Sequence, residues 1–434
     1  MIGFIIACVI LGVLMRRWHQ TYQQHEARIQ QMRVRIHVNG IRGKSTVTRL
    51  VAGVLREGGF QTVAKTTGSA AQVIHEDGNE SPIRRRGAAT IVEQIDIIRK
   101  YVTPDTEALV IECMAVTPLY QQVSQDQIVK GNITIITNVR EDHQDVMGHT
   151  LPEIADSLSN TIPYNGLLIT AEDREHLRDQ LARNAQARGS EFLYAGPAWV
   201  TDEDLQGFDY LTFRENLAIG LAVAKMLNIP RDVAMRGMRR AIPDVGVVFV
   251  QRAMVKGKEI VWAPLFAAND RESTIIGIEA LRPYHRADAT RIGVLNNRYD
   301  RAVRATKFAE IAALDLKLDY CITFGAYEAQ VTERMVELGY PRERIFNLGF
   351  SKNPILEEIL DQIVNLIEGE QGLLIGIVNI HTPQAELLMG FFHHLQDEAV
   401  ETGELIADLA HVPEIVRRRR YLISHLLKQR GEGG

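Results

Sequence analysis

The segment from residue 39 to residue 46 combines glycines, a lysine and hydroxyl side chains in the manner of a phosphate-binding loop. Glycines let backbone N–H groups close around phosphate oxygens, Lys44 can reach the terminal phosphates, and the Ser45 hydroxyl can ligate Mg²⁺. The segment departs from the common GxxxxGK[ST] pattern because Val38 stands at the first glycine position. We predict a nucleoside triphosphate site formed by Asn39, Gly40, Ile41, Arg42, Gly43, Lys44, Ser45 and Thr46.

Two further segments carry candidate metal ligands. Glu112 ends an otherwise apolar run, where a buried carboxylate is costly unless it meets a cation or hydrogen bonds. The segment 138–148 gathers three acidic side chains and His143 within five positions. Hard oxygen ligands suit Mg²⁺, and a neutral His143 can complete a second metal shell. We predict Ser45, Glu112 and His143 as metal ligands; a structural ion pair for Glu112 and a surface position for His143 are the alternatives.

Strand and helix patterns flank these motifs. Apolar and polar residues alternate over 34–38, and apolar residues follow helical spacing over 47–55 until Gly58 and Gly59. Later apolar runs of strand length, separated by helical patterns, are 108–111, 133–137, 167–170, 292–295, 320–324 and 373–378. Such alternation favours parallel α/β sheets, whose ligands bind beyond the carboxyl ends of the strands. Those ends carry Asn39, Glu112, Asn138, Asn296 and Asn379.

The composition limits the class of protein. The chain has 434 residues, of which 46% are hydrophobic and 24% charged, so it is not a disordered chain. A net charge of −5 gives no global basic field, and we expect no nucleic acid partner. Its three cysteines show no CxxC or metal-type spacing, which excludes a disulfide-stapled chain.

The first 15 residues carry no charged side chain, and Arg16 and Arg17 follow them. A cleaved signal peptide would have its positive charges before the apolar stretch. A helix of this length spans about 22 Å, less than a hydrocarbon core of about 30 Å, so it must include Trp18 or thin the bilayer. The arginines that follow place the catalytic body in the cytoplasm. We predict a single-pass membrane anchor in residues 1–33, with a buried or interfacial helix as the alternative.

A domain boundary is expected near residues 243–246, where a helical stretch ends and a second strand–helix series follows. We predict a central ATP-binding domain in 34–245 and a C-terminal domain in 246–434. The C-terminal domain ends in a basic helical tail, 412–434. A solvated helix face explains this tail, and a contact with anionic lipid or an acidic polymer is the alternative.

The shortened Gly-x-x-Gly-Lys-Ser-Thr loop, the Glu112 strand and the loop 138–145 resemble, in this order, the Mur ligase and folylpolyglutamate synthase superfamily of ATP-dependent amide ligases. The likeness to ligase subunits of poly-γ-glutamate synthases is greater and extends to about residue 395. It rests on Lys65-Thr-Thr-Gly68, Glu112-Cys-Met-Ala-Val116, Glu141-Asp-His-Gln-Asp-Val-Met-Gly148, Thr161-Ile-Pro-Tyr-Asn-Gly166, Phe266-Ala-Ala-Asn-Asp270, Asn297-Arg-Tyr-Asp-Arg301 and Asn379-Ile-His381. The resemblance implies a Mur-ligase-like P-loop central domain with a parallel sheet and a C-terminal Rossmann-like α/β domain.

The resemblance also implies the chemistry. ATP and Mg²⁺ activate a carboxylate of glutamate or of a polyglutamate end as an acyl phosphate, and an incoming amino group attacks it to form an amide. The catalytic residues implied are Lys44, Glu112, His143, Arg298, Asp300 and Arg301. The arginines suit carboxylates because guanidinium binds them bidentately, whereas Asp300 orients them, approaches the amine or only forms an ion pair. Further substrate candidates are Thr67, Arg84, Arg85, Arg86, Asn269 and Asp270.

Partners follow from the same resemblance. Glutamate, polyglutamate, the membrane bilayer and small membrane subunits for synthesis and export are expected, and a homo-oligomer stays open. A ligase for another acidic amino acid or peptide acceptor, and an ATP-binding scaffold of an export complex, are the alternatives. Mur-type ligases commonly use a junction arginine and a carbamylated lysine, for which this sequence offers no assigned counterpart.

Overall fold

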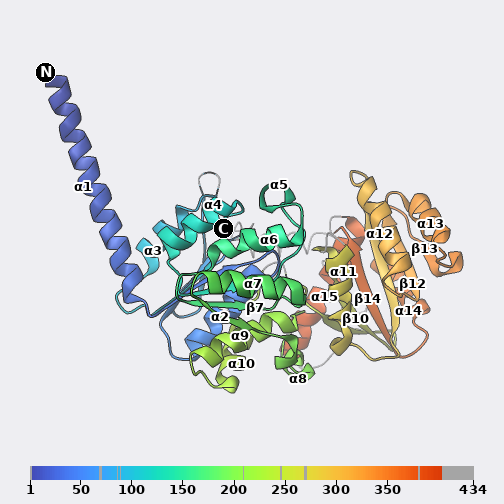
Figure 1. Ribbon diagram of the computed structural model, residues 1–434. Coiled ribbons are helices and arrows are strands. Elements are labelled where there is room, and N and C mark those ends of the chain that lie inside the picture. The colour runs from blue at the N-terminus through green and yellow to red at the C-terminus, as the bar shows by residue number, and fades with distance from the viewer. Residues whose placement is uncertain are drawn as a thin grey trace. The chain divides into compact units, whose positions relative to one another are not determined.

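The computed structural model places the glycine-rich segment between strand β1 (Val34–Asn39) and helix α2 (Lys44–Glu57, labelled in Figure 1), as the sequence predicts. The structure describes residues 2–67, 71–85, 87, 89–208, 210–244, 247–267, 271–379 and 382–402. The chain divides into unit 1, Met1–Gly207 with Thr212–Val245, and unit 2, Phe208–Leu211 with Gly246–Gly434. Each unit has its own sheet.

The sheet of unit 1 has the strand order β4-β3-β2-β5-β1-β6-β7-β8, and only β3 and β4 are antiparallel to their neighbours. The other strands are β2 (Thr62–Lys65), β3 (Gln72–Ile74), β4 (Glu80–Pro82), β5 (Ala108–Glu112), β6 (Ile133–Ile136), β7 (Leu167–Thr170) and β8 (Glu191–Tyr194). The helices are α1 (Ile2–Gln31), α3 (Glu93–Tyr101), α4 (Pro118–Val123), the π-helix η1 (Ser124–Val129), α5 (Gln144–Met147), α6 (Leu151–Leu158), η2 (Ser159–Thr161), α7 (Glu175–Ala187), η3 (Pro197–Trp199), α8 (Asp202–Gln206), α9 (Arg214–Met226) and α10 (Arg231–Arg240).

The sheet of unit 2 has the order β13-β12-β11-β14-β10-β9, and its described strands pair in parallel except at the edge, where β9 runs antiparallel to β10. Its strands are β9 (Gln251–Val255), β10 (Lys258–Pro264), β11 (Thr290–Asn297), β12 (Tyr320–Gly325), β13 (Ile345–Asn347) and β14 (Gln371–Val378). Its helices are η4 (Leu265–Ala267), α11 (Arg271–Glu279), η5 (Arg282–Tyr284), α12 (Ala302–Leu314), α13 (Glu328–Glu337), η6 (Arg342–Arg344), α14 (Leu356–Leu366) and α15 (Pro383–Thr402). The predicted parallel α/β architecture is confirmed.

Helix α2 is fixed by its apolar residues and by close helix packing. The residues at its predicted helical spacing, Val47, Leu50, Val51, Val54 and Leu55, are all buried. Helix α10 crosses α2 so closely that a Cβ on Gly53 would lie 2.3 Å from the carbonyl oxygen of Gly237. Helix α2, which follows the glycine-rich loop, is therefore packed closely against α10 and the core.

The opposite face of the sheet is covered by α3, η1 and the end of α1. Leu109 and Ile111 of β5 pack there in one apolar cluster with Ile97 and Ile98 of α3. Because successive strand residues point to opposite faces, Val110 and Glu112 of β5 face away from α3. This alternation decides which strand-end side chains can meet.

Among the described residues of helix α1, those in its C-terminal part pack on the rest of unit 1. Ile29 is buried, His25 Nε2 donates to the carbonyl oxygen of Ile128 at 2.8 Å, and Glu26 Oε1 lies 2.5 Å from Lys130 Nζ. Toward its N-terminus the apolar side chains are exposed, as Phe4 is at 76%. Within the described residues, no helix is both long and apolar enough to cross a bilayer, so the structure does not support the predicted membrane-spanning anchor.

Candidate phosphate and metal site

The loop between β1 and α2 has a backbone that requires glycine. Gly40 has φ +121°, and a Cβ there would lie 2.1 Å from Thr137 Oγ1. Gly43 has φ +78° and caps the N-terminus of α2. The loop is held by residues that follow β6, since Arg42 N donates to Asn138 Oδ1 at 3.0 Å and Thr137 Oγ1 donates to the carbonyl oxygen of Arg42 at 2.7 Å. The first N–H groups of a helix supply an anion-binding potential at this position.

Lys44 lies over this loop. Its Nζ donates to the carbonyl oxygens of Gly40 at 2.8 Å and of Ile41 at 3.4 Å. Its ammonium charge is thus beside the backbone that would face a phosphate. Asn39, in contrast, turns its amide into the core, where Nδ2 donates to Gln121 Oε1 at 2.8 Å. The side chain of Asn39 therefore anchors the start of the loop to the core and does not face the phosphate position.

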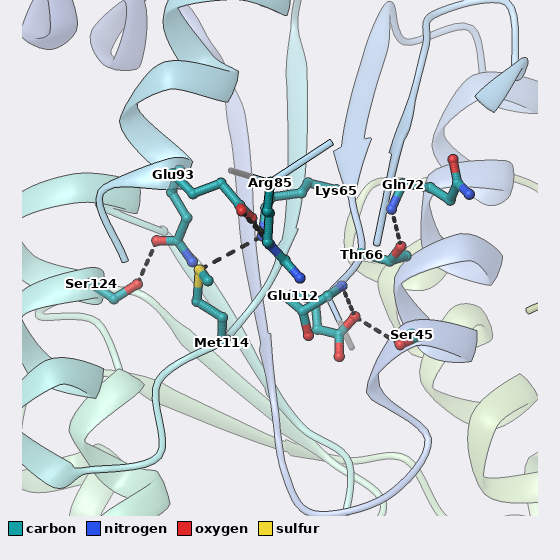
Figure 2. A network of polar contacts seen from close by, with 11 residues as sticks. Ser45, Lys65, Thr66, Gln72, Arg85, Glu93, Glu112, Met114 and Ser124 are labelled. Atoms are coloured by element: carbon teal, nitrogen blue, oxygen red, sulfur yellow. Dashed lines mark hydrogen bonds and ion pairs between the residues drawn. The ribbon is translucent and has the colours of Figure 1, made fainter. Parts of the chain in front are cut away.

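A buried carboxylate joins three strand ends beside the loop. Glu112 is 3% exposed, and its Oε2 accepts hydrogen bonds from Ser45 Oγ at 2.8 Å and from the backbone N–H of Thr67 at 2.7 Å (Figure 2). The register of the parallel pair β1 and β5 sets Val38 opposite Glu112. Ser45 and Glu112, predicted as metal ligands from separate motifs, thus lie within hydrogen-bond distance. Their hard oxygen donors, one of them ionisable, fit a divalent cation.

His143 stands apart from this pair. It has φ +45°, its side chain is 53% exposed, and its ring Nε2 lies 3.9 Å from Asp142 Oδ1. Among the described residues no three His, Cys, Asp or Glu side chains are grouped as a metal site. The loop does approach the phosphate segment through Arg42, whose Nη1 lies 3.5 Å from Asp142 Oδ2.

Glu172 is a buried carboxylate that the sequence analysis missed. It is 1% exposed and accepts hydrogen bonds from Val139 N at 2.7 Å and from Arg174 Nε at 2.6 Å. Burial raises the pKa of Glu172, but the hydrogen bonds from Arg174 and Val139 outweigh burial and leave this pKa below its ordinary value. The residue follows β7 at its carboxyl end, which is the signal that could have identified it. It fixes the start of the loop that carries His143.

The three arginines of the segment 84–86, predicted as substrate-binding residues, differ in their surroundings. Arg84 is exposed, and Arg85 forms a bidentate pair with Glu93, with Nε at 2.6 Å and Nη2 at 3.1 Å from the carboxylate oxygens. The Nε and Nη2 edge of Arg85 is therefore occupied by a protein carboxylate. The predicted residues Arg86, Asn269 and Asp270 lie outside the described residues, as does the tail from residue 403 onward.

Unit 2 also gathers polar residues at its strand ends. Strand order changes direction between β11 and β14, the position where open α/β sheets bind ligands. The amide Nδ2 of Asn296 donates to the carbonyl oxygen of Asn379 at 2.5 Å, and Nδ2 of Asn379 donates to that of Asn296 at 3.1 Å. Val378, beside them, has φ +84°, a conformation that strains a β-branched residue. The two strand ends are locked together at this point.

The loop after β11 carries the predicted carboxylate-binding arginines. Arg298 pairs bidentately with Asp300, with Nε at 2.9 Å from Oδ1 and Nη2 at 2.8 Å from Oδ2. The hydrogen bonds from Arg298 hold the pKa of Asp300 below its ordinary value. Arg301 is exposed at the N-terminus of α12. Asn297, 1% exposed, has an Oδ1 without a hydrogen-bond partner in the described part of the chain.

Comparison with known proteins agrees with this arrangement. Residues 38–208 match the Mur ligase middle domain, and residues 250–395 match the poly-gamma-glutamate synthase CapB C-terminal domain. The capsule biosynthesis protein CapB of Bacillus anthracis is 36% identical over 384 residues, which cover 88% of this chain and 81% of that protein. The PGA synthase CapB of Bacillus subtilis (strain 168) is 34% identical over 382 residues, which cover 87% and 94%.

Solved structures share the fold. A bifunctional folylpolyglutamate synthase/dihydrofolate synthase from Yersinia pestis, complexed with AMPPNP and a Mn ion, aligns with a TM-score of 0.52 at 13% identity. The alignment covers 86% of this chain and 93% of that chain.

The Ser45–Glu112 contact generates a prediction for Glu112→Gln, which keeps the shape of the side chain and removes its charge. ATP turnover should fall by at least about 100-fold, because even outer-shell partners of metal ligands are worth up to about that much. Metal-free nucleotide affinity, measured by fluorescence titration, should change by less than about threefold because the loop is intact. Glu107→Gln, immediately before the same strand, is the matched control. Turnover within about threefold of the parent protein in Glu112→Gln would contradict the assignment.

Proposed function

This chain belongs to the poly-γ-glutamate synthase CapB family, and from this premise we propose how its residues divide the reaction. It is an ATP-dependent amide ligase that synthesises poly-γ-glutamate. The observation that carries our assignment of its site is the meeting of Ser45, Glu112 and Thr67 beside the glycine-rich loop. A nucleotide loop alone needs no such buried carboxylate.

Unit 1 is proposed to activate the carboxylate. The N–H groups at the start of α2 and the ammonium of Lys44 bind the phosphates of ATP, with Asn39, Gly40, Ile41, Arg42, Gly43 and Thr46 shaping the loop. Ser45 and Glu112 would bind Mg²⁺, which supplies positive charge against the transferring phosphate. His143 is kept as the proposed ligand of a second metal ion, because its loop is tied to Arg42 through Asp142.

The reaction proceeds in two displacement steps, and in each step one bond forms as another breaks. A carboxylate oxygen of glutamate or of a polyglutamate end bonds to the γ-phosphorus as the bond to the β-phosphate oxygen breaks, which releases ADP. The nitrogen of the incoming amino group then bonds to the acyl carbon, phosphate leaves, and the nitrogen loses a proton. The chain's own residues orient the reactants and offset negative charge in both displacements.

Unit 2 is proposed to bind the incoming amino acid. Arg298 and Arg301 are guanidinium groups suited to its carboxylates. Asp300 orients Arg298 through two hydrogen bonds, and this is the role we assign to it. The buried Oδ1 of Asn297 is an acceptor suited to an ammonium hydrogen.

Attachment to a membrane is proposed for α1. Its exposed apolar residues include Val9, Ile10, Leu11 and Met15, which at about 3.6 residues per turn spread over more than half of the helix circumference. A partner helix would bury a single stripe, whereas lipid surrounds a helix completely. Arg16 and Arg17 follow, where anionic headgroups would attract them. Small membrane subunits for synthesis and export are proposed neighbours of this helix, because a polyanion made beside a bilayer has to cross it.

The function is tested by supplying ATP and Mg²⁺ with single amino acids. Glutamate should stimulate release of ADP and phosphate and lengthen polyglutamate, measured by coupled assay and gel electrophoresis. Aspartate, glutamine and short peptides tested in parallel separate this activity from that of a ligase for another acceptor. ATP turnover that ignores glutamate and yields no polymer, with membrane fractions added, would contradict the proposal.

The role of unit 2 is tested with Arg298→Gln. The KM for glutamate should rise by about 10- to 100-fold, since a charge-assisted bidentate contact is worth about 1.5–3 kcal/mol. The KM for ATP should change by less than about twofold. Arg286→Gln is the control, because Arg286 pairs with Asp288 at the same spacing, with Nε at 3.1 Å from Oδ1, before the amino end of β11. Equal effects of both substitutions on the KM for glutamate would contradict the assignment.

The role of α1 is tested by deleting residues 2–15. In flotation with anionic lipid vesicles, the full chain should float and the shortened chain should stay at the bottom, while ATP turnover stays within about twofold. Replacing Leu119 and Tyr120, exposed apolar residues of α4, by serine is the control for general stickiness. Flotation of the shortened chain equal to that of the full chain would exclude this role.

A further inference from the structure

Lys65 is the first residue of the Lys65-Thr-Thr-Gly68 motif, but neither the predicted site nor the proposed reaction gives its side chain a role. It ends β2, and its side chain is fully buried. Its Nζ lies 3.1 Å from Glu93 Oε1 and donates more weakly to Met114 Sδ at 3.8 Å (Figure 2). Val63, two residues earlier on the same face of β2, packs in the apolar cluster with α3. Lys65 is thus an ammonium buried between the sheet and α3.

Glu93 is shared by two cations. It is the first residue of α3, and it accepts from Lys65 on one side and bidentately from Arg85 on the other. Burial lowers the pKa of Lys65, and the ion pair with Glu93 opposes this shift. Burial raises the pKa of Glu93, but Arg85 and Lys65 outweigh burial, so this pKa is below its ordinary value. The three charges form one network, in which Lys65 is fully buried and Glu93 and Arg85 are partly exposed.

This network is two residues from the contact that positions Glu112. After Lys65, Thr66 N donates to the carbonyl oxygen of Gln72 at 2.9 Å, and Gln72 N donates to Thr66 Oγ1 at 3.1 Å. The next residue, Thr67, donates its N–H to Glu112 Oε2 at 2.7 Å. The direction of the chain at Thr67 therefore depends on how the end of β2 is held. Lys65 holds the end of β2 on the face of the sheet that α3 covers, and Glu112 contacts Thr67 from the opposite face.

Stability does not explain the ion pair well. Replacing a buried ion pair by apolar residues of similar volume is often neutral or stabilising, because two charges no longer have to be desolvated. If Lys65 were methionine, Glu93 would still be neutralised by Arg85. Specifying one local geometry is the best-attested role of such a pair.

We propose that Lys65 and Glu93 are positioning residues for the metal site: their ion pair fixes the end of β2, so that the Thr67 N–H directs Glu112 toward Ser45. This inference rests on the proposed function of Glu112 as a metal ligand. Lys65 touches neither metal nor substrate in this role. Its effect is on how well the site is organised before the metal binds.

The experiment measures metal binding directly. Mn²⁺ binding in the presence of AMPPNP is followed by electron paramagnetic resonance on the full-length protein. Lys65→Met should weaken Mn²⁺ binding by about 10-fold, within the range known for residues that orient metal ligands. ATP turnover should need a correspondingly higher Mg²⁺ concentration and approach the parent rate at saturation. Glu93→Gln should act in the same direction, and the double variant should lose less than the product of the two losses.

Lys130→Met is the matched control. Lys130 also pairs with a glutamate, Glu26, but its carbonyl oxygen binds Arg35 Nε at 2.8 Å, at the amino end of β1 and thus at the opposite edge of the sheet. Its Mn²⁺ affinity should equal that of the parent protein. Thermal unfolding of all variants shows whether each is folded. A folded Lys65→Met variant with unchanged Mn²⁺ affinity and Mg²⁺ dependence would overturn the inference.

Glu112→Gln in the same Mn²⁺ assay distinguishes failure of the Lys65 inference from failure of the proposed metal site. Loss of Mn²⁺ binding there with no change in Lys65→Met would contradict this inference alone. Retention of Mn²⁺ binding in Glu112→Gln would contradict the proposed metal site, and with it the basis of the inference. Should Lys65→Met unfold, Glu93→Asp supplies the same test, because the shorter side chain stays charged and moves away from the 3.1 Å contact.

Discussion

A buried carboxylate is the constraint around which unit 1 is organised. Glu112 is almost inaccessible to water, and an ionised carboxylate in that position is costly unless donors or cations surround it. The donors come from two other strand connections, the hydroxyl of Ser45 after β1 and the N–H of Thr67 after β2. Three neighbouring strands are therefore committed to one oxygen atom. A site of this kind costs stability and is explained by the chemistry it serves.

Parallel strands make this convergence possible. Their carboxyl ends lie at one edge of the sheet, so that segments far apart in the sequence place polar groups together. Unit 2 also gathers polar groups at the carboxyl ends of its parallel strands, where Asn296 and Asn379 join β11 to β14. The loop after β11 carries Arg298 and Arg301. We infer that the first edge serves phosphate and metal and the second serves carboxylates.

The sequence predicts the strands and helices because the spacing of apolar residues differs between them. The carboxyl ends of the predicted strands then indicate Ser45 and Glu112. It does not predict the Lys65–Glu93 pair, because β2 is only four residues long and Glu93 follows after two intervening strands. Local pattern carries no information on which distant carboxylate a buried ammonium meets. His143 shows the converse: its motif is recognisable in the sequence, but its side chain is half exposed on a loop, so the pattern of apolar residues does not decide where it lies relative to Glu112. The predicted anchor finds less support, since only the attached end of α1 packs on the unit.

The central claim is that Ser45 and Glu112 are a preformed ligand pair for the metal that accompanies ATP. Crystals grown with AMPPNP and Mn²⁺, measured at the manganese absorption edge, locate the metal without reference to activity. An anomalous peak is expected about 2.0–2.3 Å from both Ser45 Oγ and Glu112 Oε2, with the hydrogen bond between them replaced by coordination. A peak at the nucleotide phosphates that leaves the Ser45–Glu112 hydrogen bond intact would contradict it.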